Sequence, residues 1–412
     1  RNAYIEVIND LDLNKKAWTP IESFSGHFNG KGHTIKGLNI NRVKNNIGMF
    51  SSIESATLKN ITLENPYIYL YDWAYGSVGT LVGIDDGGST LDNIHVINPD
   101  VTSTWWGGGI IGEGESTTIS NSTVVGGSIW ARDWTTGGII GGGSYLDINN
   151  SSVIGTYVYS NAYSWDNKLG GIVGYIYGKS VSPSTIGNCI FDGEIEASYT
   201  VAGGVAGMAA GVVNISNTKV FGNISGQSQI GGIIGKSDGD NPMNLNITNT
   251  INFASIEAPS LYGGLIGDGT GGTATIYNSS NVGDIVGTEF EKQIIGSGTA
   301  SYTTADVFPE IVLMSEGIVE DIQVINSPEG YFFKGKLEVG LSENFTIVFA
   351  KRPNFDIYFD GKLLVKDDDY TIVDNEITVS SLPDKGIHKL IFISREADSN
   401  LNLNASLVVT MA

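Results

Sequence analysis

The sequence predicts an all-β protein, in which a right-handed parallel β-helix of about eight or nine coils precedes a small β-sandwich. Two observations predict the helix: a glycine-flanked apolar pair recurs about every 30 residues, and an apolar-x-Asn unit recurs between these anchors with the same period. The rhythm stops after about residue 308, which predicts a β-helix over 1–308 and a second domain over 309–412.

The glycine anchor consists of a glycine, usually a second glycine or small residue, two apolar residues and a closing glycine. Successive closing glycines are 28 to 33 residues apart. The copies are Gly79–Gly83, Gly108–Gly112, Gly137–Gly141, Gly170–Gly174, Gly203–Gly207, Gly231–Gly235 and Gly263–Gly267, with a degenerate copy at 294–296. Glycine at such corners supplies either a positive φ or a close backbone approach.

The asparagine series falls between the glycine anchors, at positions 60, 93, 121, 150, 188, 217, 249 and 278. In stacked coils, equivalent residues lie about 4.8 Å apart in the pairing direction, so a repeated Asn becomes a ladder of hydrogen-bonded amides. We expect about three short strands in each coil. A period near 30 without helical segments excludes a helical solenoid, and the Trp-Asp and Gly-His signatures of propeller blades do not recur with this period.

Composition agrees with this fold and restricts the chemistry. Glycine accounts for 55 of 412 residues and charged residues for only 16%, which favours turns and strands over helices. Cys189 is the sole cysteine, so disulfides within the chain and cysteine metal sites are excluded. It occupies a repeat position that is Ser or Thr elsewhere, and we predict a small buried side chain there.

The net charge of -21 argues against nucleic acid, anionic membranes and polyanionic substrates as partners, because a like-signed field repels them. Only seven basic residues lie between 51 and 310, too few for a phosphate or carboxylate clamp. A neutral partner fits better, although the acidity is equally explained as a solubility device.

The sequence has no transmembrane-length apolar run and no signal peptide, and a strand-like pattern begins directly after Arg1. We therefore expect a monomeric fragment of a longer secreted or cell-surface chain.

Tryptophan placement indicates a binding site. Six of the seven tryptophans fall within 93 residues, at one phase of the repeat, 6 to 11 residues before a closing glycine. The predicted ligand-binding residues are Trp73, Tyr75, Trp105, Trp106, Trp130, Trp134, Tyr163 and Trp165. Tyr69, Tyr71, Tyr157 and Tyr159 lie just upstream of this phase. Rows of exposed aromatic rings normally mean recognition. Packing inside the coils, or contact with a further domain, are the alternatives.

An uncharged polymer with flat apolar faces suits such a row, and crystalline cellulose is the first candidate. Sugar rings stack on indole and phenol rings, and about 100 Å² of burial for each ring gives roughly 2.5 kcal/mol before binding costs. Linked contacts along one polymer act together, so several weak contacts give useful affinity.

The leading rival is a polysaccharide lyase or glycoside hydrolase of β-helix fold, which needs paired carboxylates or calcium-binding Asp clusters. The densest acidic loops, Asp85-Asp86 and Asp238-Gly-Asp240, read as turns, with structural calcium as the minority interpretation. The four histidines share no phase of the repeat, so neither a His catalyst nor a zinc site is expected. We expect no cofactor and no catalysis. A protein-binding surface adhesin is the second rival.

Three resemblances accompany these patterns. The segments from Ala3 to Phe50 and the later Gly-Gly-Ile-Ile-Gly coils resemble bacterial cell-surface β-helices with GLUG-type repeats, which are common in adhesins. The stretch from Asp369 to Phe392 resembles the small immunoglobulin-like modules found beside bacterial cellulases. An acidic, non-catalytic β-helix with an aromatic surface is similar to the tāpirins, cellulose-binding adhesins, which implies display on the cell surface and attachment to plant biomass.

Overall fold

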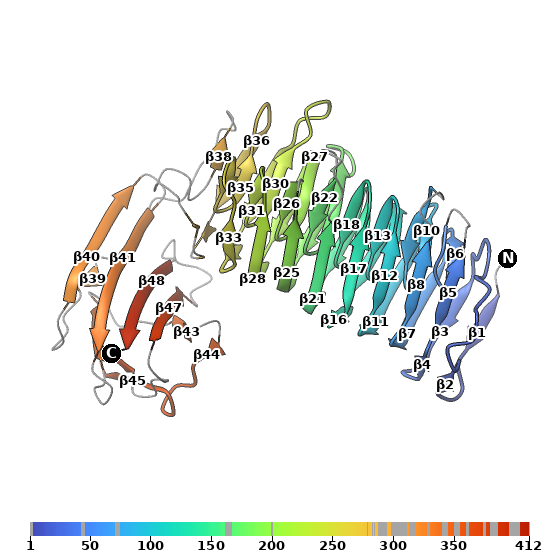
Figure 1. Cartoon of the computed structure of the whole chain (residues 1–412), viewed down its shortest axis with the longest axis horizontal. Helices are drawn as coiled ribbons and strands as arrows, with labels where there is room; N and C mark the ends of the chain where they lie inside the picture. The colour runs from blue at the N-terminus through green and yellow to red at the C-terminus, as the bar shows by residue number, and fades with distance from the viewer. Residues whose placement is uncertain are drawn as a thin grey trace. The chain divides into compact units, whose positions relative to one another are not determined.

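The computed structural model describes residues 3–42, 46–70, 75–160, 167–198 and 201–277, then 279–281, 283, 285–286 and 295–297, and the strands of the C-terminal part. The chain divides into two compact units, residues 1–303 and 304–412. The first unit is a parallel β-helix of about eight turns of roughly 29 residues. Its strands lie side by side from coil to coil, as Figure 1 shows, and its described residues form no helix.

Each coil contributes strands to five columns, which we number in chain order from the glycine anchor. Column 1 contains β9 (Ser77–Gly79), β13 (Trp106–Gly108), β18 (Thr135–Gly137), β22 (Lys168–Gly170), β26 (Val201–Gly203), β29 (Ile230–Gly231) and β34 (Tyr262–Gly263). Column 2 contains β6 (Phe50–Ile53), β10 (Val82–Asp85), β14 (Ile111–Glu115), β19 (Ile140–Ser144), β23 (Val173–Gly178), the first half of β27 (Ala206–Ser216), β30 (Ile234–Ser237), β35 (Ile266–Asp268) and β38 (Ile295–Ser297).

The other three columns join column 2 in one continuous parallel sheet, whereas column 1 forms a sheet of its own. Column 3 contains β1 (Tyr4–Glu6), β3 (His27–Asn29), the first half of β7 (Thr57–Glu64) and of β11 (Thr90–Ile97), β15 (Thr118–Ser120), β20 (Asp147–Asn149), β24 (Ser184–Gly187), the second half of β27, β31 (Asn244–Thr248) and β36 (Thr273–Tyr277). Column 4 contains β2 (Leu11–Asp12), β4 (Thr34–Lys36), the second halves of β7 and β11, β16 (Thr123–Val125), the first parts of β21 (Ser152–Ser160), β25 (Ile190–Ala197) and β28 (Lys219–Gly226), then β32 (Ile251–Asn252) and β37 (Ser280–Asn281). Column 5 contains β5 (Asn39–Arg42), β8 (Tyr67–Leu70), β12 (Asp100–Ser103), β17 (Ser128–Ala131), the last parts of β21, β25 and β28, and β33 (Ser255–Glu257).

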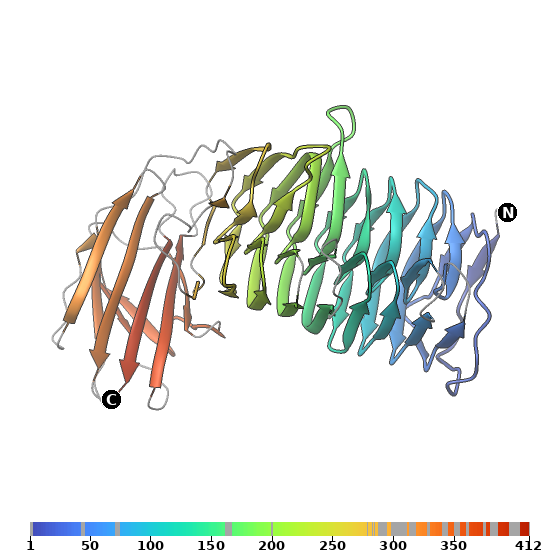
Figure 2. The same ribbon diagram turned by 45° about the horizontal axis from the view of Figure 1, so that its top comes forward.

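The predicted β-helix is therefore confirmed, but the expected three strands per coil are wrong. Strands such as β7 and β11 pass through two columns, because Asn60 and Asn93 bend the chain with φ of 55° and 57° while pairing continues on both sides. Figure 2, turned by 45°, shows the strands of successive coils stacked side by side.

The interior is a set of apolar ladders produced by strand alternation. One ladder in column 3 stacks the equivalent inward residues of eight coils, all of them buried. Its members are Leu58, Leu91, Ile119, Ile148, Ile186, Ile215, Ile247 and Ile276. Each such side chain contributes about 1.5–3 kcal/mol through burial. The repeat of apolar positions in the sequence is thus the repeat of the core.

The glycine anchor serves close backbone approach, and not a positive φ. A Cβ atom on Gly108 would lie 1.8 Å from the carbonyl oxygen of Ile111, and one on Gly112 would lie 2.3 Å from the backbone nitrogen of Val78. Column 1 and column 2 therefore meet at a tight corner that only glycine permits.

The positive φ falls instead on the asparagine series. Its described members, Asn60, Asn93, Asn121, Asn150, Asn188, Asn217 and Asn249, all have φ between 50° and 57°. The predicted amide ladder is confirmed at several steps. Asn93 donates to Oδ1 of Asn60 at 2.9 Å, and Asn249 donates to Oδ1 of Asn217 at 3.1 Å. Asn278 lies outside the described residues.

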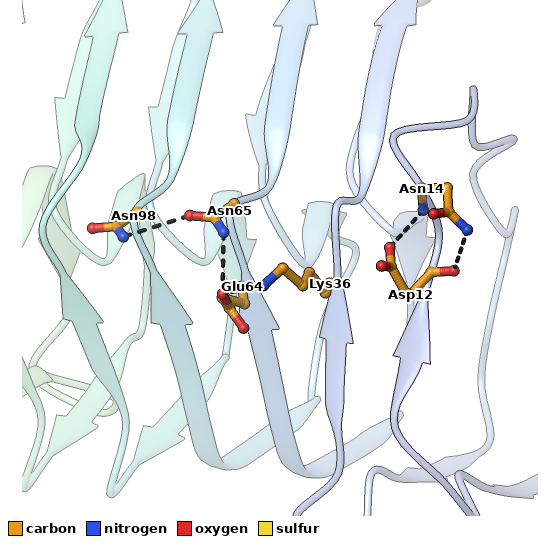
Figure 3. Close-up of polar contacts among 6 residues, drawn as sticks. All are labelled: Asp12, Asn14, Lys36, Glu64, Asn65 and Asn98. Carbon is orange, nitrogen blue, oxygen red and sulfur yellow. Dashed lines mark hydrogen bonds and ion pairs between the residues drawn. The ribbon is translucent and has the colours of Figure 1, made fainter.

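A second asparagine corner, which the sequence did not reveal, joins columns 4 and 5. Asn98 donates to Oδ1 of Asn65 at 3.5 Å, and Asn65 donates to Oε1 of Glu64 at 3.2 Å. Figure 3 shows both contacts as dashed lines. Both asparagines are left-handed, with φ of 52° and 50°. Lys36 forms an ion pair of 2.7 Å with the same Glu64, so polar contacts cross three coils at this edge.

From Asn121 onward, the residue after the repeated Asn is Ser, Thr or Cys and forms a further ladder inside the coil. Its side chain donates to the carbonyl oxygen two residues earlier, as Ser151 Oγ does to Asn149 at 2.8 Å and Thr218 Oγ1 does to Ser216 at 2.9 Å. Cys189 occupies this position, is fully buried, and directs its Sγ at Gly187 O at 3.2 Å.

The second unit has ten described strands in two sheets. The four-stranded sheet has the order β39 (Ile311–Val312), β42 (Phe345–Phe349), β46 (Glu376–Val379), β45 (Tyr370–Val373). The six-stranded sheet has the order β40 (Val319–Ser327), β41 (Gly330–Val339), β48 (Asn404–Met411), β47 (Gly386–Ser394), β43 (Phe355–Phe359), β44 (Lys362–Leu363). Every strand pair in these sheets is antiparallel except β41 with β48. The immunoglobulin-like resemblance stays a prediction.

Candidate aromatic binding site

Five of the eight predicted site residues lie among the described residues, and none of the five belongs to the hydrophobic core. Trp73, Tyr163 and Trp165 lie outside the described residues. The described tryptophans are half-buried or exposed, and Tyr75 is 65% exposed. Packing inside the coils, the main alternative, therefore does not apply to these five.

Three of the five form a stack of rings at the turn that leads from column 5 into column 1, which we call the corner stack. The Tyr75 ring centroid lies 4.8 Å from that of Trp105, at an interplanar angle of 56°. Trp105 stacks on Trp134 of the next coil at 5.6 Å and 27°. Nζ of Lys168, one coil further, lies 4.7 Å from the Trp134 ring centroid. The stack thus connects four coils, and its indole faces are largely turned toward one another.

Trp130 belongs to a different group on the outer face of column 5, which we call the strand-face row. Strand register places Tyr69, Thr102, Trp130 and Tyr159 at equivalent positions of four successive coils. The Trp130 and Tyr159 rings are 6.4 Å apart. Tyr157, two residues before Tyr159 on β21, stacks on it at 4.4 Å and 10°.

Trp106 is separated from its sequence neighbour Trp105. It lies in β13, where its six-membered ring covers Gly142 of β19: a Cβ atom on that glycine would lie 2.3 Å from the ring. It also meets Tyr175 of β23 edge-on at 6.3 Å. Its contacts are with column 2, so the single aromatic sector expected from the sequence phase is in fact two groups plus this separate ring.

Carboxylates border the strand-face row. Tyr157 donates its hydroxyl to Glu196, and burial together with this hydrogen bond raises the pKa of Tyr157. Burial, and then the charge of Asp100, raise the pKa of Tyr159, and burial raises the pKa of Asp100 itself. The row therefore combines apolar rings with negatively charged hydrogen-bond acceptors.

The segment between Trp130 and Trp134 carries an exposed ion pair. Nε of Arg132 lies 3.2 Å from Oδ2 of Asp133. Asn167 donates to the backbone oxygen of Arg132 at 2.9 Å and to Ser160 Oγ at 2.6 Å, which ties the segment to the next coil. Donors and acceptors thus lie directly between the strand-face row and the corner stack.

The same corner holds the buried polar atoms of the described residues that lack a hydrogen-bond partner. They are Ser103 Oγ, Thr135 Oγ1, Thr136 Oγ1 and Asn167 Oδ1. Each such atom costs about 1–3 kcal/mol, and native proteins accept few of them. Buried polar atoms without hydrogen bonds are expected where the sequence serves binding as well as stability.

The two acidic loops show turn contacts. Asp85 is buried and accepts hydrogen bonds from Gly87 N at 3.1 Å, Ser89 Oγ at 2.7 Å and Thr117 Oγ1 at 2.6 Å. Asp238 accepts from Asp240 N at 3.0 Å and from the Tyr175 hydroxyl at 3.2 Å. Across the described part of the chain, no three His, Cys, Asp or Glu side chains gather closely enough to hold a metal ion.

Comparison with known proteins adds a short match. No protein-family model matches the chain. A protein of Evansella cellulosilytica, named as a Gly-rich membrane protein, is 34% identical over 105 residues, which is 23% of this chain and 12% of that relative's length. An IgA1 protease structure covers 74% of this chain with 22% of its own, at 18% identity and a TM-score of 0.48. In the described residues, no helix is long and apolar enough to span a membrane.

Sequence reasoning missed several members of the site. The phase of the tryptophans does not include Tyr69, Tyr157 and Tyr159, although Tyr157-x-Tyr159 alternates as outward strand residues do. Lys168 and Tyr175 carry no signal of their own in the sequence, because their role depends on which ring the next coil places beside them.

Proposed function

We propose that this chain is a non-catalytic binding module of a secreted or cell-surface protein, and that it attaches its bearer to an uncharged plant polysaccharide, with cellulose as the first candidate. The observation that carries the proposal is the pairing of the corner stack with the strand-face row. Together they place aromatic side chains from at least three successive coils beside the corner between columns 5 and 1.

Charge supports a neutral ligand. The chain carries a net charge of -21, and the carboxylates of Asp100 and Glu196 border the strand-face row. A polyanion such as pectate would be repelled both at long range and in contact. The hydroxyls of a neutral sugar, in contrast, donate well to carboxylates. The Arg132–Asp133 pair offers a further donor and acceptor between the rings.

Energetics favour a polymer over a small sugar. Each aromatic contact contributes a few kcal/mol at most, and much of that offsets the cost of association. Several contacts on one chain act at high effective concentration, so that their combined affinity becomes substantial.

The test is retention on insoluble polysaccharide. The whole chain is mixed with cellulose, xylan and polygalacturonate, and the bound fraction is compared with that of a triple variant, Trp105→Ala, Trp130→Ala and Trp134→Ala. Tyr277→Ala is the matched control, since it removes an exposed ring from β36, outside the aromatic coils. We expect retention on cellulose, at least tenfold weaker binding by the triple variant, and no change in the control.

Two results would overturn the proposal. If no neutral polymer retains the chain, a polysaccharide ligand is excluded and a protein ligand is favoured. Steady release of reducing sugar from any of these polymers by the purified chain would establish an enzyme in place of a binding module.

A further inference from the structure

Two pairs of aromatic rings in the site are stacked face to face. In the corner stack, Trp105 and Trp134 face each other at 5.6 Å, and Lys168 covers the Trp134 ring from the next coil. On the strand face, Tyr157 and Tyr159 are nearly parallel at 4.4 Å. Rings stacked in this way cover one another's faces, so they present mainly their edges outward.

This arrangement matters for the physical form of the ligand. A flat crystal surface is contacted most favourably by rings that lie flat in a common plane, because the ring face offers the larger apolar area. A ring held between two neighbours cannot lay its face on such a surface. Upright rings in two separate rows instead suit a single chain that lies between them.

The direction of the two rows follows from strand register. Tyr69, Thr102, Trp130 and Tyr159 occupy one position in four successive coils, and Tyr75, Trp105, Trp134 and Lys168 also advance from coil to coil. Both rows therefore run along the axis of the β-helix. Three steps of about 4.8 Å give each row a length of roughly 14 Å, which is about three linked sugars.

We infer that the site binds a single extended, unbranched neutral glycan chain along the β-helix axis, between the strand-face row and the corner stack and over Arg132 and Asp133. This inference rests on the proposed function and specifies its ligand: free chains, as in amorphous cellulose or soluble oligosaccharides, are bound in preference to the faces of cellulose crystals.

One residue allows a gain-of-function test. Thr102 interrupts the strand-face row between Tyr69 and Trp130, and it lies on the outer face of β12. Thr102→Tyr would complete the row across four coils. Ser225→Tyr is the matched control: it introduces the same ring in the same column, two coils beyond Tyr159 and separated from it by Glu196.

The experiment compares amorphous with microcrystalline cellulose, and then titrates the chain with cello-oligosaccharides of two to six units by calorimetry. We expect several-fold stronger retention on amorphous cellulose, affinity that rises up to the trimer or tetramer and then levels off, and about two- to tenfold tighter binding by Thr102→Tyr only.

Equal or stronger retention on crystalline cellulose, or equal effects of Thr102→Tyr and Ser225→Tyr, would overturn the inference while leaving the proposed function intact. Failure to bind cellulose in any form, together with failure to bind any other neutral polymer, would remove both.

Discussion

The side-chain amide of Asn93 donates a hydrogen bond of 2.9 Å to Oδ1 of Asn60, one coil before it, while the Asn93 backbone holds a φ of 57°. The same residue therefore turns the chain at a corner and joins two coils. His95 adds a further contact, since its Nε2 lies 2.8 Å from Oδ1 of Asn93. The backbone conformation and the side-chain amide of Asn93 thus contribute separately to stability, and substitutions can measure each contribution.

Asn93→Gly keeps the left-handed backbone and removes the amide, so we expect a loss of about 0.5–1.5 kcal/mol in the free energy of unfolding. Asn93→Ala removes the amide and also places a Cβ atom in the left-handed region, which adds about 1–2 kcal/mol. Urea denaturation of both variants measures the difference. Equal losses would mean that the backbone conformation makes no demand on the residue at this corner.

The glycine anchor leads to a steric prediction. Gly108→Ala would place a methyl group 1.8 Å from Ile111 O and 2.8 Å from Gly141 N, both of them backbone atoms that cannot turn away. We expect about 3 kcal/mol of destabilisation or more, seen as a lower urea midpoint. Gly239→Ala is the control, because no atom lies within 4 Å of its added Cβ. Comparable losses of unfolding free energy in the two variants would show that the backbone at this corner can move to accommodate a methyl group.

Asp85 predicts a dependence of stability on pH. Burial raises the pKa of its carboxyl above the ordinary value, although the hydroxyls of Thr117 and Ser89 oppose the shift. Because the folded pKa is raised, ionisation of Asp85 weakens the folded state. The destabilisation that the ionised Asp85 causes therefore decreases as the pH falls through the folded pKa toward the unfolded value of about 4.

Asp85→Asn keeps the shape and removes the charge. We expect the variant to be as stable as the parent at pH 7 or slightly more stable, and the difference to shrink as the pH approaches 4. Thermal unfolding from pH 7 to pH 4 measures it. A variant that loses stability at pH 7, and recovers part of that loss relative to the parent as the pH falls toward 4, would show that the carboxylate is favoured in the folded state.

Much of this architecture can be predicted from the repeat, because a column of equivalent residues must satisfy the same contact in every coil. Leu58, Leu91 and Ile119 fill one interior ladder, and their spacing is visible in the sequence. The Asn ladder follows from the same argument. The left-handed backbone of Asn93 does not follow from it, because an amide ladder and a left-handed corner both favour asparagine.

The aromatic site shows where such prediction ends. Trp105 and Trp106 have almost the same phase, yet they separate at the turn before β13: one joins Trp134, and the other covers Gly142. A period identifies coils, but the direction of a side chain at a turn depends on one or two dihedral angles that the period does not contain. The role of Lys168 likewise requires the register of the following coil.

Cys189 predicts an inert thiol. It is buried, and burial raises its pKa to about 11, so little of the reactive thiolate forms at neutral pH. We expect no labelling by iodoacetamide at pH 8 until the chain is unfolded. Cys189→Ser should change the free energy of unfolding by less than about 1 kcal/mol, because Ser151 and Thr218 make the corresponding contact in neighbouring coils. Rapid labelling of the folded chain would contradict the buried position.

Ring stacking and ligand binding can be separated at Trp105 and Trp134. We expect Trp105→Ala and Trp134→Ala to show a coupling of about 0.5–1.5 kcal/mol in the free energy of unfolding, measured by a double-mutant cycle. Lys168→Gln should cost about 0.5–1 kcal/mol through the lost cation–π contact, and this cost should vanish in the Trp134→Ala background.

The same variants then measure binding. If the stack serves the ligand as well as the fold, Trp105→Phe preserves most of the stability but loses part of the apolar edge, so retention on cellulose falls while the urea midpoint stays nearly unchanged. A midpoint that falls in parallel with retention in every variant would mean that the stack acts on binding only by holding the coils together. In that case the strand-face row of Trp130 and Tyr159 would be the surface that touches the polymer.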